Sequence, residues 1–278
     1  MPELAQPLPA VFISHGAPTL ALEVSPERQF LAGFAARLGK PAAILVISAH
    51  WDSPQVGVLG GQAPSTVHDF YGFPRALYEL QYPAPGAAGL AAEIVDLLKE
   101  AGFNAALDVE RGFDHGVWTP LLLMYPQADV PVTQISINAR KSPYYHWRLG
   151  RALSSLRSRG VLVVGSGSIT HNLADCRLHG ARDNATGLPY VTDFADWLAA
   201  QLANGQLEAL LGYRERAPGA TRAHPTDEHL LPLFTALGAA GVSWSAERVH
   251  ASVMHEGLAM DHYLFSASSG ASCQPAFS

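Results

Sequence analysis

The chain has 278 residues, of which 48% are hydrophobic and 15% are charged, and its formal net charge is −6. This length allows a substantial buried core, while the acidic balance and the lack of basic or membrane-length apolar runs argue against nucleic acid and membranes as partners. Two cysteines, Cys176 and Cys273, are too few for a disulfide framework, and the N-terminus does not resemble a secretory signal, so we expect a cytoplasmic protein.

Short runs of apolar and β-branched residues predict six strands. The runs lie at 10–14, 42–48, 56–59, 132–137, 161–165 and 242–245. Few polar residues interrupt most of these runs, which is typical of strands that are buried on both faces in a parallel sheet.

Amphipathic segments between these runs predict five helices. Their expected starts, in chain order, are Ser25-Pro26, residue 87, Ser142-Pro143, Thr192 and Thr226. Gly39, Gly102 and Gly160 follow the first three helices and are expected to end them. The fifth helix is expected over 227–238, where Pro232 would kink or shorten it.

The alternation of strands and helices favours an α/β fold, with one central, mainly parallel but mixed sheet covered by helices on both faces. We expect a single catalytic domain over 1–278, with a core of about 9–265 and a flexible tail over 266–278. The long irregular segment 57–86 has the length of a functional wall or lid. In such sheets ligands bind beyond the carboxyl ends of the strands, so we expect the functional site there.

Three of the twelve histidines occur at or shortly after the ends of predicted strands. They are His15, His50 and His171. Because the carboxyl ends of parallel strands share one edge of the sheet, we expect these imidazoles to lie together in a metal or acid–base site. Neutral imidazoles with an open position are typical of catalytic Fe(II) or Zn(II) sites rather than closed structural ones.

Two further segments offer histidines to this site. HPTDEHLLP (224–232) contains His224 and His229, and we expect His229, held by the start of the fifth helix, to be the better third ligand. His115 follows Asp114 in a turn, and a carboxylate next to a histidine can orient its ring.

Aromatic residues near these histidines predict a wall that contacts a planar substrate. His68, Phe70 and Tyr71 belong to the irregular segment and form the main part of this expected wall. Trp51, directly after His50, is a further candidate for substrate contact, although it could equally close its strand.

Seven short motifs then carry a resemblance to a known family. SHGAP, SAHW, HDFYGFP, YPAPG, GFDHG, SGSITHNL and HPTDEHLLP occur in this order. Together they resemble the class III extradiol ring-cleavage dioxygenases, in the aromatic ring-opening branch that contains 4,5-DOPA dioxygenases. The resemblance extends from about Pro9 to Phe265, which is nearly the whole chain.

The resemblance implies roles for individual histidines. It implies that His15, His50 and His229 bind the metal, and that His171 is either a fourth ligand or the acid–base residue. It also implies that His115 is a second catalytic histidine on the oxygen side of the site. Many class III enzymes use two histidines and a glutamate, whereas here the third position holds His229 beside Glu228.

The resemblance finally implies an activity. We expect an extradiol dioxygenase of aromatic compound metabolism that opens a DOPA-like catechol with O2, as a monomer or small homo-oligomer. Fe(II) is the metal expected for activity, and a site of imidazoles would also accept Zn(II) in a purified sample. Two alternatives stay open at this point: a zinc-dependent hydrolase that uses the same histidines, and a non-catalytic metal-binding protein.

Overall fold

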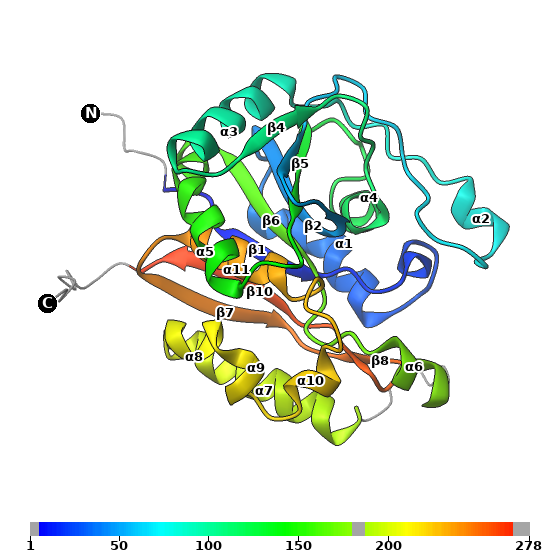
Figure 1. The fold of residues 1–278 in the computed structure, drawn as a ribbon. Helices are drawn as coiled ribbons and strands as arrows, with labels where there is room; N and C mark the ends of the chain where they lie inside the picture. Colours follow the sequence, from blue (N-terminus) through cyan, green and yellow to red (C-terminus); the bar gives the residue numbers. More distant parts are fainter. Residues whose placement is uncertain (1–5, 180–186, 269–278) are drawn as a thin grey trace, which may run out of the picture.

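The structure is a computed structural model and describes residues 6–179 and 187–268 (Figure 1). Its strands are β1 (Ala10–Ser14), β2 (Ala43–Asp52), β3 (Val56–Leu59), β4 (Ala105–Asp108), β5 (Val132–Ile137), β6 (Val161–Gly167), β7 (Trp244–His250), β8 (Val253–Met254), β9 (Leu258–Ala259) and β10 (His262–Ala267). Its α-helices are α1 (Pro26–Leu38), α2 (Arg75–Tyr78), α3 (Ala88–Glu100), α4 (His115–Met124), α5 (Pro143–Ala152), α6 (Leu173–His179), α7 (Pro189–Ala203), α8 (Leu207–Leu211), α9 (Tyr213–Arg216), α10 (Ala220–Ala223) and α11 (Leu231–Ala240). Two 3-10 helices cover Pro18–Ala21 and Ser154–Arg159.

Within these described residues, eight strands form one mixed sheet in the order β4-β3-β5-β2-β6-β1-β10-β7. The four central strands β5, β2, β6 and β1 run parallel to one another. β10 pairs antiparallel with both β1 and β7, and β3 pairs antiparallel with β5. The predicted α/β fold with a mainly parallel sheet is confirmed.

Both faces of the central strands are buried, as their continuous apolar runs indicate. Alternate residues of β1 and β2 point to opposite faces. Phe12 and Leu45 pack with α3, α5 and α11 on one face, and Ile13 and Val46 pack with α1 and α4 on the other. In Figure 1 the helices α7 to α10 form a further group beside β7.

The first three predicted helices lie where the sequence places them. The Ser25 side chain caps α1 by accepting the backbone N–H of Arg28, and α1 ends before Gly39. α3 ends at Glu100, just before Gly102. The third helix differs in its second half, because after Ala152 the chain continues as a 3-10 helix to Gly160.

The threonine N-caps predicted for the fourth and fifth helices are wrong. α7 begins at Pro189, so Thr192 lies inside its first turn rather than before it. α11 begins at Leu231 rather than at 227, with Pro232 in its first turn. A proline suits this position because the first helical residues have no intrahelical acceptor for their N–H groups. His229 therefore precedes the helix and is not held within it.

Other differences concern the edges of the sheet. β2 extends to Asp52, so His50 lies within the strand, and β7 covers Trp244–His250 instead of 242–245. β4 and β10 were not predicted. The expected tail begins at 266, whereas β10 continues through Ala267; residues 269–278 of that tail lie outside the described part of the chain.

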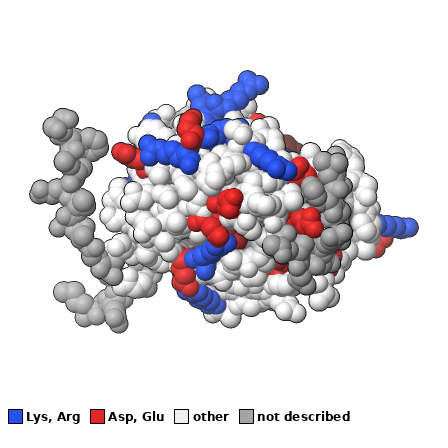
Figure 2. Space-filling model, turned by 90° about the horizontal axis from the view of Figure 1, so that it is seen from below, with Lys and Arg blue, Asp and Glu red and all other residues white. Residues whose placement is uncertain are grey.

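No helix in the described ranges is long and apolar enough to cross a membrane. On the face drawn in Figure 2, basic and acidic side chains are interspersed rather than gathered by sign.

Candidate active site

The fold brings histidines from distant segments to the carboxyl edge of the sheet. His15 directly follows β1, His50 lies near the end of β2, and His171 follows β6. Because β2, β6 and β1 are parallel neighbours, these three chain positions share one edge, as the sequence predicts.

His229 reaches the same edge through a close backbone contact. Its carbonyl oxygen accepts the N–H of Ser168 at 2.9 Å, which fixes the turn before α11 against the end of β6. A side chain at Gly167 would place its Cβ 2.0 Å from that carbonyl oxygen, so only glycine permits the approach.

These residues line a cavity of about 330 Å³. Its walls contain five histidines and a set of small, aromatic and aliphatic residues. The lining residues are His15, Gly16, Ala17, Pro18, His50, Phe70, Phe73, His115, Ser168, His171, Leu173, His229 and Leu258.

The five imidazoles form two compact groups within the cavity. One nitrogen from each of His15, His50 and His115 lies within 4.8 Å of the others, and the Nε2 atoms of His15 and His50 are 3.0 Å apart. The rings of His171 and His229 stack with centroids 3.4 Å apart. The His229 centroid lies 4.9 Å from that of His50 and 5.5 Å from that of His15, which is close to the 4.9 Å between His15 and His50, so His229 borders the same centre as His115 does.

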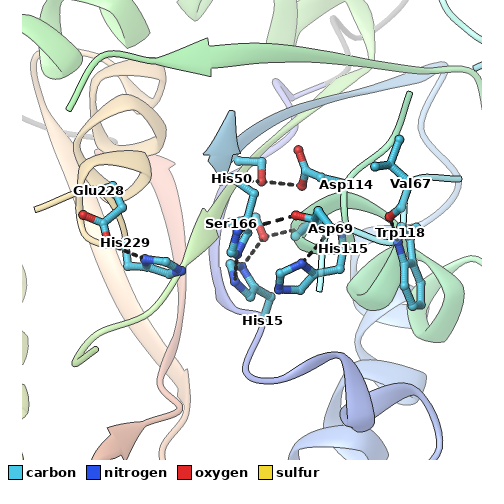
Figure 3. A network of polar contacts seen from close by, with 12 residues as sticks. His15, His50, Val67, Asp69, Asp114, His115, Trp118, Ser166, Glu228 and His229 are labelled. Atoms are coloured by element: carbon cyan, nitrogen blue, oxygen red, sulfur yellow. Dashed lines mark hydrogen bonds and ion pairs between the residues drawn. The ribbon is translucent and has the colours of Figure 1, made fainter. Parts of the chain in front are cut away.

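Side-chain oxygens hold the Nδ1 atoms of three of these rings (Figure 3). Nδ1 lies 2.9 Å from Ser166 Oγ in His15, 2.9 Å from Asp69 Oδ1 in His115 and 3.0 Å from Glu228 Oε1 in His229. Such partners fix the ring orientation and leave Nε2 as the nitrogen that can bind a metal or a proton.

Burial keeps most of these histidines neutral at pH 7. It lowers the pKa of His50 to about 4, with a further contribution from the nearby charge of His115. Burial also lowers the pKa of His15 and of His229 well below the ordinary value, and that of His171 to about 4. Neutral imidazoles with Nδ1 already engaged are the donor set that a divalent transition metal requires, so the residues fit a metal site.

The carboxylate that contacts His115 is Asp69 and not its sequence neighbour Asp114. The Asp114 side chain accepts hydrogen bonds from Ser48 Oγ (2.6 Å), Arg111 Nη2 (2.8 Å) and Gln134 Nε2. Asp114 therefore ties the start of α4 to β2 and β5. For Asp69, burial would raise the pKa, but the hydrogen bonds and charge of His115 outweigh it and hold the pKa at about 2.

The expected aromatic wall is only partly what the cavity contains. Phe70 lines the cavity, whereas Tyr71 points into solvent and His68 bonds the carbonyl oxygen of Leu80 at 3.1 Å. Trp51 follows His50 on the strand, and successive strand side chains point to opposite faces, so Trp51 packs against Gly57 away from the cavity. Phe73, in the same aromatic motif as Phe70, also lines the cavity and was not among the predicted residues.

One other contact was not predicted, and the sequence had ranked His224 below His229 as a ligand. Ser166, from the GSGS segment, bonds His15, and no local pattern distinguishes it from Ser168 in the same segment. His224 is fully buried, does not line the cavity, and has Nε2 2.8 Å from the carbonyl oxygen of Ile169.

Comparisons with known proteins agree with this geometry. The family pattern described as "Catalytic LigB subunit of aromatic ring-opening dioxygenase" matches residues 9–266. A protein named 4,5-DOPA dioxygenase extradiol from Beta vulgaris is 44% identical over 244 residues, which cover 86% of this chain and 89% of the relative. A protein of the same name from Escherichia coli (strain K12) is 41% identical, with 84% of this chain and 85% of the relative covered.

A solved structure gives the same result for the fold. The crystal structure of an uncharacterized Escherichia coli K12 protein superimposes with a TM-score of 0.78 at 34% identity, and covers 92% of this chain and 99% of that chain. The match over nearly the whole sequence, the shared fold and the histidine-lined cavity together lead to one conclusion: the chain belongs to the LigB family of class III extradiol, aromatic ring-opening dioxygenases.

Proposed function

We propose that this dioxygenase opens the ring of a catechol with a DOPA-like side chain, with O2 as co-substrate and Fe(II) as the metal required for turnover. The main support is the cavity, which five imidazoles line together with aromatic and aliphatic side chains. Its volume of about 330 Å³ is at the small end of the range for small-molecule sites, which suits one substituted ring. The names of the Beta vulgaris and Escherichia coli relatives support the catechol class.

His15, His50 and His229 are the side chains that we assign to the metal. His171 is assigned as a fourth ligand or as an acid–base group. When bound, Fe(II) supplies the electron transfer that allows a catecholate to react with O2. Zn(II) would accept the same imidazoles but has no redox chemistry, so it is expected to compete for the site without supporting turnover.

The protein's own contribution includes proton transfer from two sides of the cavity. His115 and His229 lie on opposite sides of His15 and His50 (Figure 3), and His171 stacks on His229. The lowered pKa of His171, caused mainly by burial, leaves its ring unprotonated at pH 7 and able to accept a phenolic proton. We assign that step to His171, and we assign proton return on the oxygen side to His115.

Apolar side chains would position the ring and exclude water. Phe70 and Phe73 lie on one wall of the cavity, and their ring centroids are 5.2 Å apart. Leu173 and Leu258 add aliphatic surface to the lining. Aromatic walls suit a planar substrate, because they offer contact area with a defined stacking geometry.

An oxygen-dependence experiment tests the proposal. Protein loaded anaerobically with Fe(II) is mixed with L-DOPA or another substituted catechol, and air is then admitted. A coloured ring-opened semialdehyde should form only after air enters, with one O2 consumed for each catechol. No product from any catechol at verified iron occupancy would show the proposal to be wrong.

The same experiment separates the two alternatives. A zinc-dependent hydrolase would act with Zn(II) and without O2. A non-catalytic metal-binding protein would bind catechols without consuming O2. Zn(II)-loaded protein is the matched control, and we expect it to bind the catechol and leave O2 untouched.

A further inference from the structure

Asp69 contacts two histidines of the cavity at once (Figure 3). Its Oδ1 accepts the backbone N–H of His115 at 3.0 Å and lies 2.9 Å from Nδ1 of the same residue. Its Oδ2 lies 3.7 Å from Nδ1 of His50. The rings of His50 and His115 have centroids 3.9 Å apart, so one carboxylate faces a proposed metal ligand and a proposed acid–base group together.

The chemistry of this contact selects a tautomer. A carboxylate accepts hydrogen bonds and has no proton to donate, so Nδ1 of His115 must be the donor. A ring with its single proton on Nδ1 carries its lone pair on Nε2. Oδ2 is too far from His50 for a hydrogen bond, at 3.7 Å from Nδ1, and acts on that ring only through its charge.

The backbone around Asp69 is tied to the element that carries His115. The N–H of Val67 donates to the carbonyl oxygen of Phe113 at 2.8 Å, and Trp118 Nε1 donates to the carbonyl oxygen of Val67 at 3.0 Å. Phe70, the next residue after Asp69, lines the cavity. The same short segment therefore supplies an aromatic wall and the carboxylate behind the histidines.

We infer that Asp69 is a positioning residue of this active site, which holds His115 in the tautomer that leaves Nε2 free for the cavity. Its importance for turnover rests on the proposed function, because that function gives His115 its acid–base role. The tautomer selection itself depends only on the contacts of Asp69.

Asp69→Asn and Asp69→Ala test this role. The Asn side chain keeps the shape of Asp but is uncharged. It also replaces one of the two carboxylate oxygens by an NH2 group, which donates instead of accepting. The Ala side chain removes both contacts. Asp96→Asn, an exposed position on α3, is the matched control for the same chemical change.

The first measurement does not depend on activity. Two-bond proton–nitrogen NMR spectra of ¹⁵N-histidine-labelled, Zn(II)-loaded protein report which ring nitrogen carries the proton, with His115→Gln assigning the signal. We expect the Nδ1–H form for His115 in the wild type and in Asp96→Asn. We expect Asp69→Ala to populate the Nε2–H form.

The second measurement is steady-state kinetics at saturating Fe(II) with verified iron content. We expect kcat to fall about 10- to 100-fold in both Asp69 variants, as is typical when a group behind an active-site ligand is lost. The KM for the catechol should stay within about 3-fold, because the aromatic wall is intact, and Asp96→Asn should match the wild type in both parameters.

The outcomes separate this inference from the proposed function. An unchanged His115 tautomer in Asp69→Ala would overturn the inference, as would a changed tautomer with wild-type kcat. If the tautomer shifts as expected but the wild type never consumes O2, the proposed function is wrong and the selection of the tautomer by Asp69 stands. A variant that loses stability alone, with the same tautomer and kcat in its folded fraction, would also overturn the inference.

Discussion

Two groups of buried histidines, one around the cavity and one in the core, differ in a way that defines the site. The cavity group includes His15, His50 and His229, and the core group includes His146, His224 and His262. Burial lowers the pKa in both groups, to about 4 for His50, His146 and His224. A lowered pKa therefore does not distinguish a functional histidine from a structural one.

The hydrogen-bond partners do distinguish them. In the core, His146 uses both nitrogens on backbone groups: Nε2 accepts the N–H of Asn138 at 3.2 Å, and Nδ1 lies 3.0 Å from the carbonyl oxygen of Ser142. Around the cavity, side-chain oxygens hold Nδ1, and Nε2 remains for chemistry. An unused nitrogen alone does not identify the cavity group, because His224 Nδ1 and His262 Nε2 also lack a partner among the described residues. A side-chain oxygen at Nδ1 together with a ring that lines the cavity does.

The largest effect is expected from His50→Ala. This change removes the Nε2 atom that lies 3.0 Å from that of His15, so metal affinity should fall more than 100-fold and O2 uptake should drop to background. Metal content after dialysis and an oxygen electrode measure the two effects. His250→Ala is the control, because His250 lies outside the cavity and bonds Ser252, and it should keep its metal. Stoichiometric metal in His50→Ala would contradict the assigned ligand set.

His171→Ala should have the next largest effect. Loss of a group that accepts a proton in the reaction typically reduces the rate by about 10²- to 10⁴-fold. Iron content, measured alongside O2 uptake, distinguishes the two roles: retained iron indicates an acid–base group, and lost iron indicates a fourth ligand. Survival of both iron and turnover would show that His171 has neither role.

The pH dependence of stability is expected to follow the buried histidines of both groups. The pKa of His146 and that of His224 are about 4 in the folded protein, below the ordinary value of about 6.5. Between these values the unfolded chain binds more protons, so the free energy of unfolding of the metal-free protein should fall by several kcal/mol from about pH 6.5 to pH 4.

Asp261 has the opposite effect on the free energy of unfolding in part of this pH range. Burial raises its pKa to about 6, so the folded protein gains stability at this site as the pH falls. One carboxyl group does not offset several histidines. Urea unfolding at about pH 7, 5.5 and 4.5 measures the sum, and a flat or rising profile toward acid would contradict the prediction.

His146→Ala should give the smallest effect and the opposite pattern to His50→Ala. It leaves the Asn138 N–H and the Ser142 carbonyl without this partner, so the free energy of unfolding should fall by about 2–3 kcal/mol. Metal content and kcat of the folded fraction should stay at wild-type levels. Loss of metal in this variant would remove the distinction between the two groups of histidines.

Apolar runs and strand-end histidines were enough to predict the fold class and the edge of the sheet that carries the site. Runs such as AILVIS in β2 are apolar at every position but the last, and only a strand covered on both faces buries such a run completely. Parallel pairing of β1, β2 and β6 then places His15, His50 and His171 at one edge, so strand-end histidines alone predicted this part of the cavity. The seven motifs in their fixed order carried the family resemblance.

Which side chains meet in the site could not be predicted from local sequence patterns. Asp69 bonds His115 across 46 positions of the chain, while the adjacent Asp114 turns to Ser48 and Arg111 instead. Local sequence patterns report burial and backbone conformation, because both depend on neighbouring residues. Long-range hydrogen-bond partners depend on how separate elements pack, and no local pattern contains that information.

The same reason explains His229 and Trp51. The sequence suggested that a helix holds His229, but its place is set by a backbone contact with Ser168, which becomes neighbouring only when α11 packs on β6. Trp51 is next to a cavity histidine in sequence, yet the alternation of strand side chains turns it to the opposite face, against Gly57. Sequence positions were enough to predict where the site lies, but the packing of separate elements determines which side chains line it.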